Sequence, residues 1–219
     1  TPSVTSTPGA GLPNASSSVG SKSTWRTGES IVTPRAVDGR GPTSATTSGT
    51  RNVVFSTACV YPFVPVNGPG AAEDTPPAPP GGDYANSCVG RERMFEYGSH
   101  EYGTPGRMVR LSYAIDMRYG VLHDVARAVF AGEDIDLSMG HVNVIWQGDA
   151  NEQALRLLAH CTTPVTPINI TGPRHISIRW LAGEFGARLG CEPRLFGREV
   201  SNAWLEDTSL AISLFGEPR

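Results

Sequence analysis

Two short segments carry hydroxyl groups in a spacing that could move a proton. The first is Ser56-Thr57-Ala58-Cys59-Val60-Tyr61, which follows a short apolar run, and the second begins at Tyr84. Ligands of open α/β sheets bind outside the carboxyl ends of the strands. A hydroxyl there, such as that of Thr57, can hold a substrate oxygen, and a tyrosine opening the next helix can exchange a proton with it. The pattern predicts acid/base chemistry on an alcohol or a ketone.

The elements that must position these groups alternate between strands and helices. Short apolar runs rich in β-branched residues indicate strands, and apolar positions three and four apart indicate helices. Strands are predicted over 52–56, 107–115, 141–146 and 165–171, and helices over 84–97, 122–131, 151–160, 177–190 and 204–215. In the helix over 151–160, Leu155 and Leu158 are expected to face inward. Ser177 is expected to cap the helix over 177–190. This alternation implies βαβ units around a parallel sheet, so the predicted fold class is α/β.

Composition excludes several classes of protein. The 219 residues hold 18 Lys+Arg and 21 Asp+Glu, a formal net charge of −3, which lacks the basic excess of nucleic-acid-binding proteins. No apolar run is long enough to span a membrane. The four cysteines are widely spaced and form no CxxC pair, so no metal site is predicted and a reduced, cytoplasmic protein is expected.

The first part of the chain differs in texture from the rest. Of the first 50 residues, 32 are Ser, Thr, Gly or Pro, a composition too poor in apolar side chains to build a core. We therefore expect a disordered or irregular arm over 1–51, followed by an α/β domain over 52–219.

Five motifs in order give the α/β part a resemblance to a known family. They are Thr57-Ala58-Cys59-Val60-Tyr61; Tyr84-Ala85-Asn86-Ser87-Cys88; Arg110-Leu111-Ser112 with Gly120; Gly148-Asp149 with Ala154; and Asn169-Ile170-Thr171-Gly172. Each is weak alone, but their order and spacing resemble the C-terminal portion of the extended short-chain dehydrogenases/reductases, in the NAD-dependent epimerase/dehydratase branch. The resemblance implies a partial Rossmann-like, doubly wound parallel sheet with a C-terminal substrate-binding part.

The resemblance also implies roles for particular residues. Thr57 would bind the substrate hydroxyl or carbonyl, and Tyr84 would be the general acid/base. Ser56, Ser112 and Tyr113 would lie near the NAD or NADP cofactor. The substrate would be a nucleotide sugar or a small polyol, and the protein would act as an oxidoreductase or an isomerase. The resemblance is also compatible with a homodimer.

Two departures from the family pattern limit what the chain can do alone. The family's lysine, whose charge lowers the pKa of the catalytic tyrosine, is replaced by Cys88, and a thiol supplies no positive charge. The glycine-rich turn that binds the dinucleotide phosphates is also missing, since Gly9-Ala10-Gly11 follows no strand and precedes no helix. We expect a truncated or degenerate member, and the isolated chain to be inactive.

Two other classes of function stay open. The loss of the lysine favours a non-catalytic binding or regulatory protein on the same fold, and Thr57 or Tyr84 would then have structural roles. A viral structural protein with an extended arm is a third interpretation, which the strand–helix alternation disfavours. A half sheet would also expose a strand edge and apolar faces, which predicts poor solubility or oligomerisation.

Overall fold

A computed structural model describes residues 50–219 of the chain. The predicted arm over 1–51, including the Gly9-Ala10-Gly11 sequence, lies almost wholly outside the described residues. Residues 50–219 belong to one unit with the mixed α/β structure that the sequence predicts.

A three-stranded parallel sheet forms the centre of this unit. Its strands are β1 (Asn52–Thr57), β3 (Gly106–Leu111) and β8 (Thr166–Ile170), in the order β1-β3-β8. The register places Ser56 beside Arg110, and Arg110 beside Asn169. Because side chains alternate along a strand, these three residues share one face of the sheet.

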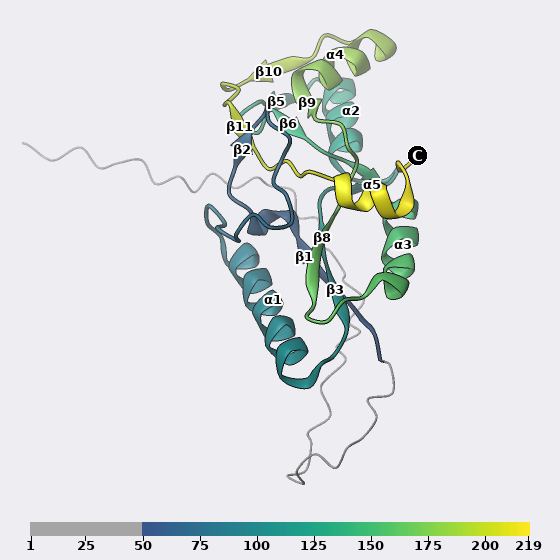
Figure 1. Ribbon diagram of the computed structural model, residues 1–219. Helices are drawn as coiled ribbons and strands as arrows, with labels where there is room; N and C mark the ends of the chain where they lie inside the picture. Colours follow the sequence, from purple (N-terminus) through teal and green to yellow (C-terminus); the bar gives the residue numbers. More distant parts are fainter. Residues whose placement is uncertain (1–49) are drawn as a thin grey trace, which may run out of the picture. The chain divides into compact units, whose positions relative to one another are not determined.

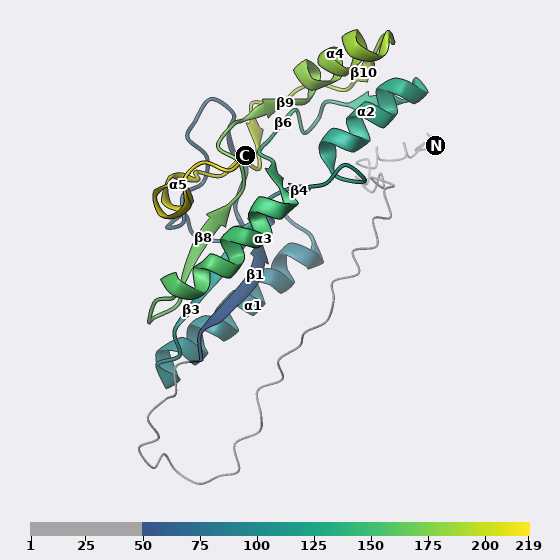
Figure 2. The same cartoon turned by 90° about the vertical axis from the view of Figure 1, so that its right-hand side faces the viewer.

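Helices cover both faces of this sheet (Figures 1 and 2). Helix α1 (Asp83–Tyr102) packs on the face that carries Arg110, and α3 (Gln147–Arg156) and α5 (Ser209–Phe215) pack on the other. The second face is apolar: Val109, Ile168 and Ile170 are fully buried and share a core with Ala150, Leu157 and Ala211. This arrangement is a layer of sheet between two layers of helix.

A second core lies beyond the carboxyl ends of the sheet strands (Figure 1). It joins α2 (Val121–Ala131) and α4 (Ile178–Leu189) through Val125, Val129, Leu181 and Ala182. The remaining short strands form two-stranded sheets. Strand β10 (Arg194–Phe196) pairs with β5 (Asp134–Asp136), and β6 (His141–Val142) pairs with β9 (Ile176–Ser177). Strand β4 (Ala114–Ile115) pairs with β7 (Ile145–Trp146), and β11 (Asn202–Ala203) pairs with β2 (Val64–Pro65).

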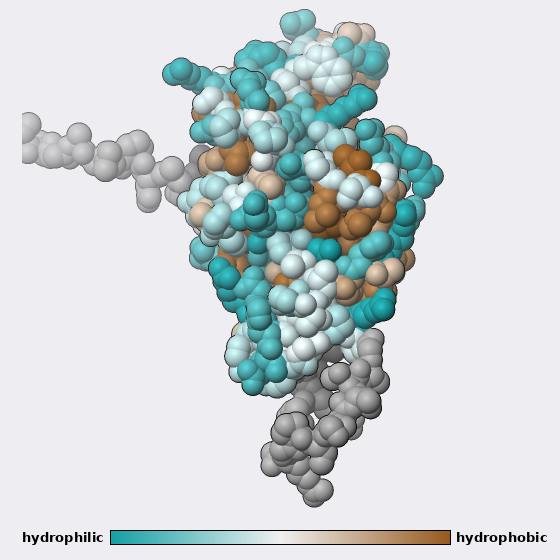
Figure 3. All heavy atoms as spheres, in the orientation of Figure 1, coloured by the Kyte–Doolittle hydropathy of each residue, from teal (hydrophilic) through white to brown (hydrophobic). Residues whose placement is uncertain are grey.

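Helix ends follow the local sequence. The hydroxyl of Ser177 accepts a hydrogen bond from the backbone N–H of Trp180 and caps α4, as predicted. Gly190 ends the same helix in a left-handed conformation, which glycine adopts without steric cost. Figure 3 shows an apolar patch in the position of α5, where Leu210, Ile212, Leu214 and Phe215 are half-buried.

No helix among residues 50–219 combines the length and the apolar character needed to cross a membrane. The four cysteines, at 59, 88, 161 and 191, are all free thiols.

Candidate functional site

The hydroxyl groups predicted to act together meet at the carboxyl end of β1. Thr57 is the last residue of that strand, and its Oγ1 accepts a hydrogen bond from the Cys59 backbone N–H at 3.3 Å, capping the short 3-10 helix η1 (Ala58–Val60). Tyr84 stands in the first turn of α1, which packs against η1. The Thr57 side chain is buried, whereas Tyr84 is 64% exposed and faces solvent. A ligand can therefore reach the tyrosine hydroxyl.

The surroundings of Tyr84 keep its hydroxyl protonated. Partial burial and the neighbouring thiols of Cys88 and Cys59 raise the pKa of Tyr84, and a hydrogen bond with Thr57 opposes them. Cys88, in the position of the family's lysine, is fully buried in a small apolar cluster. Arg91 lies one turn further along α1, and its guanidinium donates a hydrogen bond to the Phe55 carbonyl of strand β1 at 2.6 Å.

Ser112 and Tyr113 lie at the carboxyl end of the neighbouring strand, β3. Ser112 is buried, and its backbone N–H bonds the Ile170 carbonyl at 3.2 Å. Tyr113 has a φ of 35°, in a region that a bulky side chain rarely adopts. Burial, then Cys59 and Glu206, raise the pKa of Tyr113 to about 12. Cys59 thus interacts electrostatically with both Tyr84 and Tyr113, which lie at the ends of neighbouring strands.

Glu206 is a further member of this site that the sequence did not reveal. It lies in the segment before α5, is 1% exposed, and faces Ser112, Tyr113 and Cys59. Burial raises the pKa of Glu206 to about 7, against a weaker opposing interaction with the Ser112 hydroxyl. A lone acidic residue far along the chain carries no motif, so only the folded chain brings it to the strand ends.

Ser56, the remaining predicted site residue, points to the opposite face of β1 from Phe55 and joins a different group. Its hydroxyl donates to Glu92 on α1 at 2.6 Å, and both residues are buried. The structure thus places Thr57 near Tyr84 at the end of β1, places Ser112 and Tyr113 at the end of β3, and places the Ser56 hydroxyl in an internal network.

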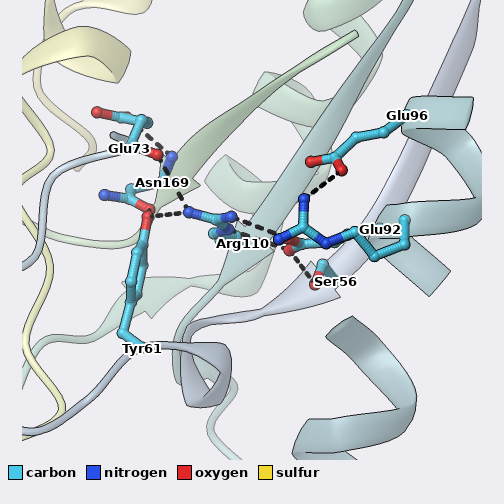
Figure 4. A network of polar contacts seen from close by, with 8 residues as sticks. Ser56, Tyr61, Glu73, Glu92, Glu96, Arg110 and Asn169 are labelled. Carbon is cyan, nitrogen blue, oxygen red and sulfur yellow. Dashed lines mark hydrogen bonds and ion pairs between the residues drawn. The ribbon is translucent and has the colours of Figure 1, made fainter. Parts of the chain in front are cut away.

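That network, drawn in Figure 4, holds together the strands that carry the site. Arg110 forms a two-pronged ion pair with Glu92, at 3.0 and 2.8 Å, and its other nitrogen donates to the Tyr61 hydroxyl at 2.8 Å. Tyr61 in turn donates to Asn169 Oδ1 at 2.8 Å. The chain of contacts therefore runs from α1 across β3 to β8 and fixes the strands whose ends form the site.

The part of the chain that the structure describes, residues 50–219, has no group of three or more His, Cys, Asp or Glu side chains placed to hold a metal ion. The polar side chains that gather at the site are hydroxyl, thiol and carboxyl groups.

Comparisons with known proteins place the chain by its fold. No protein-family model and no curated protein sequence matches it. Among solved structures, it is similar to the UDP-glucose 4-epimerase of Thermus thermophilus in complex with NAD (TM-score 0.62, 18% identity, 77% of this chain and 59% of that chain). It is also similar to the UDP-glucose 4-epimerase of Thermotoga maritima with UDP-glucose (TM-score 0.61, 18% identity, 77% and 58%).

A third similar structure is the dTDP-glucose 4,6-dehydratase of Bacillus anthracis in complex with NAD (TM-score 0.64, 16% identity, 76% of this chain and 56% of that chain). The chain thus spans less than two thirds of the length of each of these proteins. At these identities the likeness shows the fold, and it confirms the predicted Rossmann-like α/β architecture. The structural neighbours of this chain are NAD-dependent epimerases and dehydratases of nucleotide sugars.

Proposed function

We propose that this chain is the substrate-binding portion of an NAD(P)-dependent epimerase/dehydratase-like oxidoreductase, acting on a nucleotide sugar or a related polyol. The observation that carries the proposal is the pairing of Thr57 and Tyr84 at the carboxyl end of β1. The fold adds support, because similar structures hold NAD and UDP-glucose.

The two hydroxyl groups have distinct tasks in this proposal. Thr57, buried and already bonded to the Cys59 N–H, would hold one substrate oxygen in place. Tyr84, which is exposed, would pass a proton to or from that oxygen as the alcohol and ketone interconvert. Its raised pKa favours the protonated form, so Tyr84 is better suited to donate a proton than to remove one.

The fit to a dinucleotide cofactor is partial. NAD or NADP would supply the hydride acceptor when bound. Ser112 and Tyr113, the residues proposed to contact it, follow β3 directly, and Tyr113 interacts electrostatically with Cys59, as Tyr84 does. Ser56 was predicted to contact the cofactor, but its hydroxyl is occupied by Glu92. The glycine-rich turn that would bind the phosphates is not found among residues 50–219. We therefore propose that cofactor binding needs residues beyond those described.

A binding experiment tests the substrate class. We expect the 219-residue chain to bind UDP-glucose in a calorimetric titration, and Thr57→Val to weaken that binding about tenfold, the worth of one buried hydrogen bond. Tyr97→Phe, a change at an exposed tyrosine on the same helix, is the matched control and should bind normally. No binding by the wild-type chain would contradict the proposal.

A turnover experiment tests the chemistry. The isolated chain is expected to give no NAD-dependent oxidation of UDP-glucose, because it lacks the phosphate-binding turn. Reading the coding DNA upstream of Thr1, with an intact mass of the natural protein, would show whether a strand, glycine-rich turn and helix precede the chain. In such a longer protein, Tyr84→Phe should abolish turnover and leave UDP-glucose affinity unchanged.

The second candidate is a non-catalytic binding protein on the same fold, in a reduced, cytoplasmic setting. The fully buried thiol of Cys88 favours it, since no positive charge from this position can lower the pKa of Tyr84. In that case the chain, and any longer protein that contains it, would bind UDP-glucose without oxidising it, and Tyr84→Phe would change neither result.

A further inference from the structure

Glu206 is buried without the partners that a buried carboxyl normally has. The residue is 1% exposed, and neither carboxyl oxygen makes a hydrogen bond of normal geometry among the described residues, although the Ser112 hydroxyl lies near enough to interact with the carboxyl. Buried polar groups are almost always hydrogen-bonded, and a buried charge is normally paired. A folded protein that keeps such a group at its strand ends keeps it at a cost to stability, so a role in binding is the natural explanation.

The backbone fixes Glu206 in this place from two sides. Its N–H donates to Asn143 Oδ1 at 3.0 Å, and its neighbours Leu205 and Asp207 bond the backbone of Ala71 at 2.7 and 3.0 Å. Gly70, at a φ of 96°, lets the loop approach closely: a Cβ there would lie 2.4 Å from the Glu206 carbonyl carbon. The position of the carboxyl is therefore held by the fold.

The groups that face this carboxyl are those of the candidate site. Ser112 and Tyr113 face it from the end of β3, and Cys59 faces it from η1. None of the three carries a positive charge. Cys59 is half-buried and interacts electrostatically with both Glu206 and Tyr84.

Tyr113 gives an independent sign that this corner binds a ligand. Its φ of 35° is costly for a bulky side chain, and such strain persists where the surrounding structure imposes it, most often at binding sites. The residue is also 42% exposed. Because Glu206 is 1% exposed, a ligand that contacts its carboxyl must displace part of the surrounding structure, and the exposed Tyr113 is the side chain proposed to move.

We propose that Glu206 is a specificity-determining residue of this site, whose carboxyl accepts a hydrogen bond from a hydroxyl group of the sugar that is bound against Tyr84. This inference rests on the proposed function. It gives the ligand a second anchor point, at the end of β3, in addition to Thr57 and Tyr84 at the end of β1. In the complex, the sugar hydroxyl then supplies a hydrogen bond to the Glu206 carboxyl.

The test is a calorimetric titration of UDP-glucose into the full chain at about pH 6 and about pH 8, on either side of the raised pKa. A carboxylate accepts a stronger hydrogen bond than a neutral carboxyl, so wild-type affinity should rise several-fold between these values. Cys59 and Tyr113, the other titratable groups facing Glu206, both have raised pKa values and stay protonated over this range. Glu206→Gln should bind about tenfold more weakly at the higher pH, with equal affinity at the two pH values.

The control and the outcomes separate this inference from the proposed function. Glu199→Gln changes a glutamate whose ion pair with Arg179 is at the surface, and it should bind like the wild type. If Glu206→Gln binds like the wild type at both pH values, the inference is overturned and the proposed function stands. If the wild-type chain does not bind UDP-glucose, both fail. A melting curve of Glu206→Gln establishes that the variant is folded.

Discussion

Tyr84 and Cys88 show how a single side chain sets the chemistry of its neighbour. A lysine at position 88 would stabilise the tyrosinate, whereas the thiol in the structure contributes to a raised pKa for Tyr84. Burial is the largest cause of the raised pKa of Tyr84, and the Cys88 thiol adds to it. Cys88 is itself fully buried, so it acts on Tyr84 without contacting a ligand.

The variant Cys88→Lys should lower the pKa of Tyr84, because a positive charge near the hydroxyl favours its ionised form. The measurement is a titration of tyrosinate absorbance, with the signal of a matching Tyr84→Phe chain subtracted. Cys191→Lys, at a half-buried cysteine outside the site, is the control and should leave the titration unchanged. An unshifted titration in Cys88→Lys would contradict the assignment of this pair.

Glu206 should also make the stability of the chain depend on pH. Its pKa is about 7 in the folded chain, against 4.5 for the ordinary carboxyl. The folded state thus holds this proton more tightly, and stability falls as pH rises from about 4.5 through about 7. The loss amounts to roughly 3 kcal/mol at about pH 8.

Urea unfolding at about pH 5 and about pH 8 measures this contribution to the free energy of unfolding. Glu206→Gln removes the titrating group, so the pH-dependent loss should shrink by most of that amount and the variant should be more stable than the wild type at the higher pH. Glu199→Gln should keep the wild-type dependence. An identical pH profile for Glu206→Gln and the wild type would show that the carboxyl is not desolvated as described.

At the scale of the elements, the buried row Ser56–Arg110–Asn169 joins the sheet to α1. A buried ion pair adds little net stability, but removing one partner leaves an unpaired buried charge. Arg110→Met should therefore destabilise the chain by about 3–5 kcal/mol, and Arg110→Met combined with Glu92→Leu by less, because no charge is left unpaired. Chemical denaturation of both variants checks the order.

The control for this prediction lies on the outer side of the same helix. Arg93 and Glu96 form an exposed ion pair at 2.7 Å, and such pairs contribute at most about 1 kcal/mol. Arg93→Ala should thus have a small effect. A double variant less stable than Arg110→Met alone would mean that the network does not act as a charge pair.

The sequence predicted the elements that have strong local signals. The strand over 52–56 and the helices over 84–97 and 122–131 are present as β1, α1 and α2 with small shifts at their ends. The prediction for 151–160 was wrong about its buried face: Leu155 and Leu158 are 71% and 41% exposed, and Ala150, Gln153, Ala154 and Leu157 point inward. The helix begins at Gln147, earlier than predicted, and small residues pack its inner face.

Elements that depend on distant partners could not be read from the sequence. The single strand predicted over 141–146 is two strands, because β6 pairs with β9 and β7 pairs with β4. The strand predicted over 107–115 is likewise two strands, separated by Ser112 and Tyr113, because β3 pairs with β1 and β8 whereas β4 pairs with β7. Likewise, the spacing of Thr57 and Tyr84 predicts that they act together, whereas Glu206 comes near Ser112 only through the backbone contacts that hold its segment in place.

At the scale of the whole molecule, the two edge strands of the sheet, β1 and β8, each have one strand neighbour within residues 50–219. Among residues 50–219, β1 pairs only with β3. On the sheet face that carries α3 and α5, Phe55 of β1 is 45% exposed. Strand edges with exposed apolar side chains pair with other chains.

We therefore predict that the isolated chain self-associates. Sedimentation velocity should show association that increases with protein concentration, and Phe55→Lys should reduce it, because a charge on an edge strand opposes pairing. Phe130→Lys, at a 73% exposed position on α2, is the control and should associate like the wild type. A clean monomer at high concentration would contradict the prediction.

The buried place of Asn169 has a consequence for the modification of this chain. Asn169-Ile170-Thr171 is an acceptor triplet for N-linked glycans. In the folded chain Asn169 is fully buried, its Nδ2 donates to the carbonyls of Ala71 and Asp207 at 2.9 Å, and Thr171 is buried as well. A glycan on this amide would displace both contacts and could not be accommodated beneath the segments that carry Ala71 and Asp207. Glycosylation at this triplet and the native fold therefore exclude each other.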